Sequence, residues 1–145
     1  MIGLVQRVSE ASVTVDNKII SEIGHGLLVL LGVEKHDNSE QIEKLTRKIS
    51  QYRLFSDDEG KMNLNVQQVN GAILVVSQFT LVADTQKGNR PGFSKGASPV
   101  QGKLIYEQFI TALKEKGLPV QTGQFGADMK VALVNDGPVT FQFHV

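Results

Sequence analysis

The stretch Ala72-Ile73-Leu74-Val75-Val76-Ser77-Gln78-Phe79-Thr80-Leu81 is the most informative part of the chain for its fold. Its apolar first half, rich in branched side chains, predicts a buried strand. That strand runs directly into polar residues. Because side chains alternate across a strand, Ser77 and Phe79 are expected on one face, and Gln78 and Thr80 on the other. The segment therefore predicts a core strand with a polar end.

Toward the N-terminus, the apolar patterns predict further strands. Residues 2–8 form one candidate, and residues 27–33 form a strand buried on both faces. Between them, two short β-branched runs flank Asp16-Asn17-Lys18, a pattern typical of a hairpin. The pattern then changes period over residues 42–52, where the apolar residues fall at helical spacing. Either Asp37 with Glu40 or Asn38 with Gln41 could form the capping box of that helix.

Toward the C-terminus, residues 84–102 shift to Gly, Pro, Ser and basic residues, which predicts a long loop. Ser98 and Pro99 predict the start of a second helix, and Gly117 its end. The apolar positions expected to face the core are Val100, Leu104, Ile105, Phe109, Ala112 and Leu113. Three strands are then expected, at residues 120–125, 130–135 and 139–145.

The order of elements is strands, helix, strand, helix and strands, without regular alternation of strand and helix. This order favours an α+β fold with a mostly antiparallel, curled or barrel-like sheet and two main helices packed outside it. With 145 residues, of which 41% are hydrophobic, the chain is long enough for one domain with its own core. We therefore expect a single domain over residues 1–145.

The composition excludes several kinds of function. Lys and Arg balance Asp and Glu at 15 each, which argues against a protein that holds nucleic acid by overall charge alone. The absence of cysteine removes disulfides and thiolate chemistry. The three histidines show no ligand spacing, so we expect no metal and no cofactor. The longest apolar run, residues 26–33, is too short to cross a membrane, and we expect a cytoplasmic protein.

The polar strand end offers a limited chemistry. Ser77 and Thr80 carry hydroxyls, Gln78 an amide and Phe79 a flat apolar ring. A threonine hydroxyl is a poor nucleophile without an adjacent base, so the backbone N–H of Thr80 is as plausible a contributor as its hydroxyl. The plainer interpretation, which the pattern alone favours, is a strand whose polar residues face water.

Two further segments are candidates. Gly137-Pro138 interrupts two apolar runs, and such a turn can present carbonyl oxygens outward as rigid acceptors. A plain connection between strands is the alternative. The other segment carries Lys87, Arg90, Lys95 and Lys103 among glycines, which fits a contact with a phosphate backbone or, equally, a solvated loop.

In combination, four stretches resemble the bacterial D-aminoacyl-tRNA deacylases over the whole chain. They are Val5-Gln6-Arg7-Val8 with Ala11-Ser12-Val13, Ser77-Gln78-Phe79-Thr80-Leu81, Lys87-Gly88-Asn89-Arg90-Pro91, and Asn135-Asp136-Gly137-Pro138-Val139-Thr140. The resemblance implies hydrolysis of the ester that joins a D-amino acid, or mischarged glycine, to tRNA. It also implies a homodimer whose active sites lie at the interface.

The resemblance assigns roles to particular residues. Gly137 and Pro138 would form a cis peptide that reaches into the partner's site and excludes L-amino acids by clash. Arg7 would brace that segment. Ser77, Gln78 and Thr80 would be the catalytic residues, with Thr80 acting either as a nucleophile or through its N–H. The residues expected to bind substrate are Phe79, Arg7, Phe125 and Met129, of which Phe125 and Met129 would hold the terminal adenosine. The alternatives are a non-catalytic tRNA-binding module and a structural dimer with an unrelated ligand.

Overall fold

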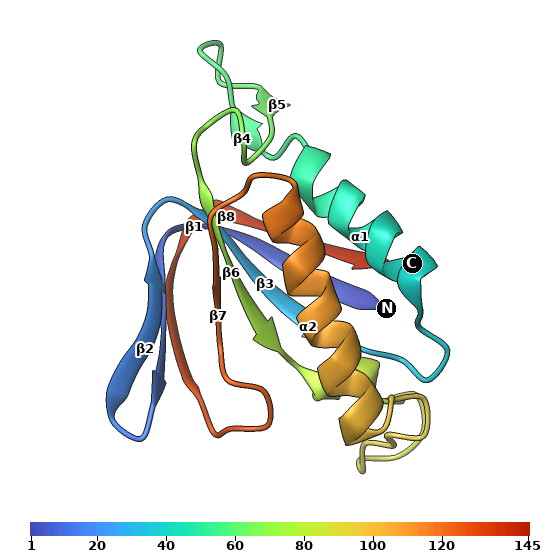
Figure 1. Ribbon diagram of the computed structural model, residues 1–145. Helices are drawn as coiled ribbons and strands as arrows, with labels where there is room; N and C mark the ends of the chain where they lie inside the picture. Colours follow the sequence, from blue (N-terminus) through green and yellow to red (C-terminus); the bar gives the residue numbers. More distant parts are fainter.

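The computed structural model describes all 145 residues as one curled sheet with two helices against one of its faces (Figure 1). The strands are β1 (Ile2–Val15), β2 (Lys18–Ile23), β3 (Gly26–Gly32), β4 (Phe55–Ser56), β5 (Met62–Leu64), β6 (Ala72–Ser77), β7 (Val120–Thr122) and β8 (Lys130–His144). The helices are α1 (Ser39–Gln51) and α2 (Pro99–Glu115), with a short 3-10 helix, η1 (Phe79–Val82).

The main sheet has six strands in the order β2-β1-β3-β6-β7, with β8 paired to the other side of β1. Strand β1 is antiparallel to β2, β3 and β8, while β3–β6 and β6–β7 are parallel. The hydroxyl of Ser21 in β2 donates to the carbonyl of Thr122 in β7, which brings the two outer strands together and nearly closes the sheet. The predicted α+β fold with a barrel-like sheet and outer helices is confirmed.

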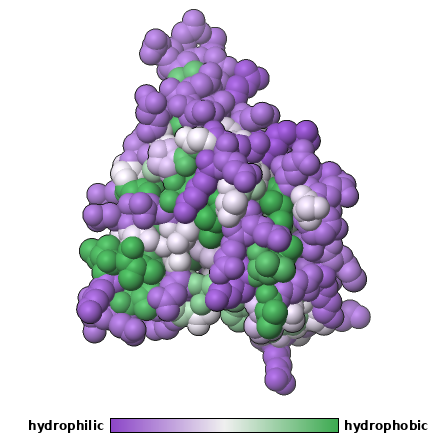
Figure 2. All heavy atoms as spheres, viewed as in Figure 1, coloured by the Kyte–Doolittle hydropathy of each residue, from purple (hydrophilic) through white to green (hydrophobic).

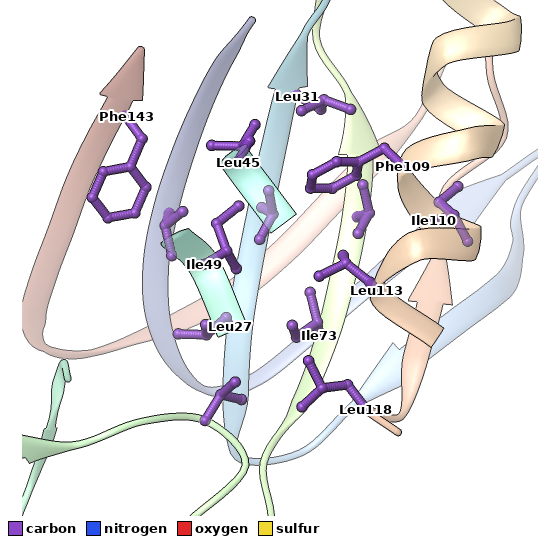
Figure 3. Packing of buried hydrophobic residues seen from close by; sticks show 14 of the residues in the cluster. Leu27, Leu31, Leu45, Ile49, Ile73, Phe109, Ile110, Leu113, Leu118 and Phe143 are labelled. Atoms are coloured by element: carbon purple, nitrogen blue, oxygen red, sulfur yellow. The ribbon is translucent and has the colours of Figure 1, made fainter. Parts of the chain in front are cut away.

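Alternation along the central strands builds two separate cores. Leu27, Val29 and Leu31 of β3 point toward the helices, whereas Leu28 belongs to a smaller cluster inside the curled sheet. Figure 3 shows the larger cluster, in which side chains of both helices meet those of β3 and β6. Phe109 of α2 is completely buried there, and burial of such a side chain stabilises the fold by about 1.5–3 kcal/mol. Both faces of β3 and β6 are therefore fixed by packing.

The helices begin where the sequence predicts. Asn38 caps α1 in a capping box with Gln41, and Ser98 caps α2 with Pro99 in its first turn. The predicted buried face of α2 is partly wrong. Val100 is 84% exposed and Leu104 is 54% exposed, because the stripe that faces the sheet at helical spacing consists of Gly102, Ile105, Tyr106, Phe109, Ile110 and Leu113.

Several strand boundaries also differ from the prediction. Residues 2–15 form one long strand instead of two, and β7 stops at Thr122. Strand β6 ends at Ser77, after which the chain coils into η1, so the expected alternation does not continue to Thr80. The segment with Gly137 and Pro138 lies within the single long strand β8.

The pairing of β8 with β1 is interrupted around that segment. Gln6 pairs with Thr140 and Val8 pairs with Asn135, so four residues of β8, 136–139, lie opposite the single residue Arg7. Such an insertion bends a strand and redirects its side chains. The sequence therefore folds this segment into an enlarged β-bulge.

Several apolar side chains are exposed at the surface. Figure 2 shows them gathered over β2 and over α2, separated by hydrophilic atoms. They include Ile19 and Ile20 in β2 and Val100 and Leu104 in α2. Neither helix is long and apolar enough to span a membrane.

Candidate active site

A hollow of about 530 Å³ opens where β3 and β6 end and α2 begins. It is lined mainly by apolar side chains together with a few hydroxyl, amide and backbone groups. The lining residues are Leu31, Val33, Val76, Ser77, Gln78, Phe79, Ala97, Ser98, Pro99, Gly102, Phe125, Gly126, Ala127, Met129 and Val131. An apolar hollow with a few polar groups is the usual form of a small-molecule site.

The polar rim is positioned by the end of the parallel pair. Ser77 lies beside Leu31, and the N–H of Gln78 donates to the carbonyl of Leu31 over 2.8 Å. The chain then turns into η1, whose first hydrogen bond runs from the N–H of Leu81 to the carbonyl of Gln78 over 3.2 Å. The N–H groups of Phe79 and Thr80 precede this bond, so η1 gives them no acceptor. Both are candidate donors for an oxygen on a bound molecule.

Thr80 does not itself line the hollow. Its hydroxyl accepts a hydrogen bond from the side-chain amide of Gln78, which does line it. Phe79 is 67% exposed and its ring lies 5.1 Å from that of Phe93. The fold therefore brings together three of the predicted residues, Ser77, Gln78 and Phe79. Thr80 joins them through its hydrogen bond with Gln78.

The opposite wall is held by aromatic packing. The ring of Phe125 lies 5.6 Å from that of Tyr106, whose hydroxyl donates to the carbonyl of Val75 over 2.9 Å. Burial raises the pKa of Tyr106 to about 12, so the phenol stays neutral at ordinary pH. Met129 joins this wall, and its sulfur accepts from the N–H of Gln124 at 3.4 Å. The predicted pair Phe125 and Met129 thus lies in the same hollow as the polar rim.

The electrostatics of the hollow come from dipoles. None of its lining residues is titratable, and no group of three or more His, Cys, Asp or Glu in the structure could hold a metal ion. An apolar, low-dielectric wall strengthens each hydrogen bond made inside it. Chemistry in this hollow would therefore depend on positioning and on neutral donors, without a base from a side chain.

The segment at Gly137 and Pro138 is braced from two sides. The Arg7 side chain donates from Nε to the carbonyl of Asp136 over 2.9 Å and from Nη1 to the carbonyl of Leu54 over 2.8 Å. Asn135 Oδ1 accepts from the N–H of Val139 over 3.1 Å. The Gly137-Pro138 peptide is cis, and Gly137 has a φ of +132°. At that φ a side chain would be strained, so the bulge depends on glycine.

In one chain, this segment and the hollow lie apart. Arg7 pairs with Leu27 near the start of β3, whereas the hollow begins at Leu31. Four residues of strand span roughly 13 Å. Neither Arg7, Gly137 nor Pro138 lines the hollow. The predicted site residues therefore form two groups, one level with Leu27 and the other level with Leu31 of β3.

Sequence reasoning missed several lining residues. Leu31, Ala97 and Gly102 carry no chemistry of their own and reach the hollow only through the tertiary fold. Of these, only Gly102 could have been noticed in the sequence, because glycine inside a helix is unfavourable unless packing requires it. A Cβ there would touch Phe125 Cζ at 3.4 Å, so the glycine leaves room for that ring.

Comparison with known proteins identifies the family. Residues 4–144 match the family model described as D-Tyr-tRNA(Tyr) deacylase. The chain belongs to this deacylase family. It is 68% identical to a D-aminoacyl-tRNA deacylase of Alteromonas mediterranea and 60% identical to one of Pseudoalteromonas atlantica, each compared over the full length of both chains. The predicted family, and an enzyme of the hydrolase class, are confirmed.

Two solved structures resemble the deacylase fold. One is titled a c-Myc DNA unwinding element binding protein; it is 40% identical, with a TM-score of 0.95 over 100% of this chain and 99% of the other. The second is titled a probable eukaryotic D-amino acid tRNA deacylase and has a TM-score of 0.81 over 98% and 97% of the two chains. At 18% identity, the second likeness concerns the fold alone.

Proposed function

We propose that the chain hydrolyses the ester of D-aminoacyl-tRNA, and of glycine mischarged on tRNA, in the cytoplasm. The observation that carries the proposal is the hollow, which combines an aromatic wall with neutral donors and contains no titratable side chain. An aminoacyl ester is already activated and needs little beyond orientation and oxyanion stabilisation. The names of the full-length relatives support the same substrate class.

In the proposed step, a water attacks the ester carbonyl carbon, helped by the neighbouring ribose hydroxyl. The bond between that carbon and the ribose oxygen then breaks. The hydroxyl of the water joins the acyl carbon, and its proton goes to the ribose oxygen. The products are the free amino acid and tRNA with a free terminal hydroxyl. The N–H groups of Phe79 and Thr80 would donate to the oxygen that becomes negative, and Ser77 and Gln78 would orient the ester.

The terminal nucleoside of the substrate would occupy the wall with Phe125 and Met129. A flat aromatic ring offers a stacking surface to a base, and such stacking contributes about 1–3 kcal/mol per base. Phe79, largely exposed at the rim, would cover the ester or the amino acid.

The proposal includes a homodimer in which Gly137 and Pro138 of one subunit enter the hollow of the other. The support is geometric: Gly137 and Pro138 do not line the hollow of their own chain, and the proposal places them in the hollow of the partner. A backbone segment held by Arg7 and Asn135 can exclude an L side chain by clash without contacting the D side chain.

The deciding experiment compares hydrolysis of D-tyrosyl-tRNA and L-tyrosyl-tRNA by purified, metal-free protein. Rapid loss of the D-ester alone supports the proposal. If neither ester is cleaved while tRNA still binds, the deacylase proposal fails and a non-catalytic tRNA-binding module replaces it. Hydrolysis of glycyl-tRNA in the same assay tests the achiral substrate.

The shared site has its own test. Gly137→Ala disables the segment, and Phe125→Ala disables the hollow. Unfolded and refolded together in equal amounts, the two inactive variants form mixed dimers with one intact site each, so about a quarter of the wild-type activity returns. No recovery, despite mixed dimers detected by native mass spectrometry, would exclude a site shared between subunits.

A further inference from the structure

The chain between η1 and α2 forms a loop with a fixed base beside the hollow. Asp84 and Gly92 exchange two backbone hydrogen bonds, of 2.7 and 3.1 Å. Residues 85–91 between them are all exposed, and Gly88 makes a tight turn with a φ of +68°. We call residues 84–92 the basic loop. Its paired base limits how far its tip can move relative to the sheet.

The cations of this loop have no partners in the structure. Lys87 and Arg90 lie at the tip, and neither forms an ion pair or a side-chain hydrogen bond. The one acidic residue, Asp84, accepts a hydrogen bond from the N–H of Gln86 over 3.0 Å. In a chain with no net charge, two unpaired cations on a projecting tip form a local positive field.

The basic cluster on α1 is different. On α1, Lys44 is paired with Glu40, and Lys48 lies over the rings of Tyr52 and Phe143 at 5.6 and 5.5 Å. These cations already interact with groups of the chain itself. Only Arg47 in that cluster forms no ion pair or cation–π contact, so the basic loop is the surface better suited to a new anion.

The basic loop returns directly into the wall of the hollow. Phe93, next to Gly92, packs against Phe79 on the rim. A few residues further on, Ala97 lines the hollow and donates its N–H to the carbonyl of Val33 over 3.0 Å. A chain that leaves the hollow past Phe79 and Phe93 would therefore meet the loop.

We propose that Lys87 and Arg90 bind backbone phosphates of the single-stranded tRNA end whose terminal ester lies in the hollow. This inference rests on the proposed function and adds the surface that recognises the nucleic acid. Contacts with phosphates fix register without reading sequence, so they would serve tRNAs of every sequence alike. They would also place the ester at the donors of Phe79 and Thr80.

The experiment compares two substrates that share the ester. One is D-tyrosyl-tRNA; the other is D-tyrosine esterified to adenosine, which has no phosphate. In the double variant Lys87→Gln/Arg90→Gln, the ratio of kcat/KM for tRNA to that for the adenosine ester falls about tenfold. The slope of log kcat/KM for tRNA against log salt becomes shallower by about one per cation removed.

The matched control is Lys114→Gln/Lys116→Gln, which removes two exposed cations from the far end of α2. In this control the ratio stays within about twofold of wild type, as expected for cations outside the binding surface. An unchanged ratio and an unchanged salt slope in the loop variant overturn the proposal. So does a larger loss in Arg47→Gln/Lys48→Gln, which would place the contact on α1. If the wild type hydrolyses neither substrate, the proposed function itself has failed.

Discussion

The hollow and the segment at Gly137 and Pro138 are built by different physical means. The hollow is shaped by packed side chains such as Phe125 and Met129, which can adjust to a ligand by small rotations. The Gly137 segment is shaped by backbone, held by hydrogen bonds to Arg7 and Asn135. A packed apolar surface suits binding of varied molecules, whereas a fixed backbone suits exclusion. In this molecule the two properties are separated by four residues along β3.

The largest effect is expected from adding a side chain to the braced segment. In Gly137→Ala, the new Cβ would lie 2.8 Å from Val139 Cγ2 and 3.0 Å from Arg7 Nη2, at a φ that already disfavours alanine. A displacement of about 1 Å there lowers kcat/KM for D-tyrosyl-tRNA by about a hundredfold.

The matched control is Gly117→Ala, which also has a positive φ (+79°) but has no atom within 4 Å of the new Cβ. Activity close to wild type is expected in this control, with a similar cost in stability measured by thermal unfolding. Equal losses of activity in both variants would mean that backbone strain alone, and not the position of the segment, causes the effect.

A smaller effect is expected from Arg7→Lys. Lysine keeps the charge but has one ammonium group, which cannot donate to the carbonyls of Asp136 and Leu54 as the guanidinium does. Loss of one charged hydrogen bond costs about 1.5–3 kcal/mol, so the preference for the D-ester over the L-ester falls by about tenfold.

Arg53→Lys is a suitable control, since Arg53 is a neighbouring arginine that donates to Asn63 Oδ1 away from the bulge. If the preference for the D-ester over the L-ester is unchanged in both variants, the hydrogen bonds of Arg7 are not needed to reject L-esters.

At the hollow, Thr80→Ala is expected to have a modest effect. The backbone N–H remains, and only the hydrogen bond from Gln78 to the hydroxyl is lost. A neutral hydrogen bond contributes about 1 kcal/mol, so kcat falls about fivefold. Single-turnover hydrolysis measures this, and a near-complete loss would instead support the hydroxyl as nucleophile.

The smallest effect is expected from Tyr106→Phe, which removes a support behind the wall. The carbonyl of Val75 loses the hydroxyl donor but keeps the N–H of Gly123 at 2.9 Å, and the ring of Phe125 keeps its neighbour. Stability falls by about 1 kcal/mol and KM rises about twofold, with kcat unchanged. A change in kcat would mean that this wall orients the reacting ester as well as the nucleoside.

The sequence indicated the polar residues of the candidate site better than it indicated the apolar walls of the hollow. Ser77 and Gln78 became candidates because polar residues follow a buried strand, a local signal, and the family resemblance assigned them a role in the site. The coil of η1 was not foreseen, because strand alternation carries no information about where a strand ends. Leu31 and Ala97 reach the hollow from other elements, and only the fold brings them there. For the same reason, Val100 and Leu104 were expected in the core although α2 turns them outward.

The absence of a titratable group among the residues of the hollow has a consequence for inhibitor design. A competitive inhibitor gains affinity there from a flat ring against Phe125 and from a hydrogen-bond acceptor near the N–H groups of η1. An added carboxylate or amine would lose its hydration without gaining an ionic partner. Neutral compounds are therefore the better starting point, and their affinity is expected to vary little with pH.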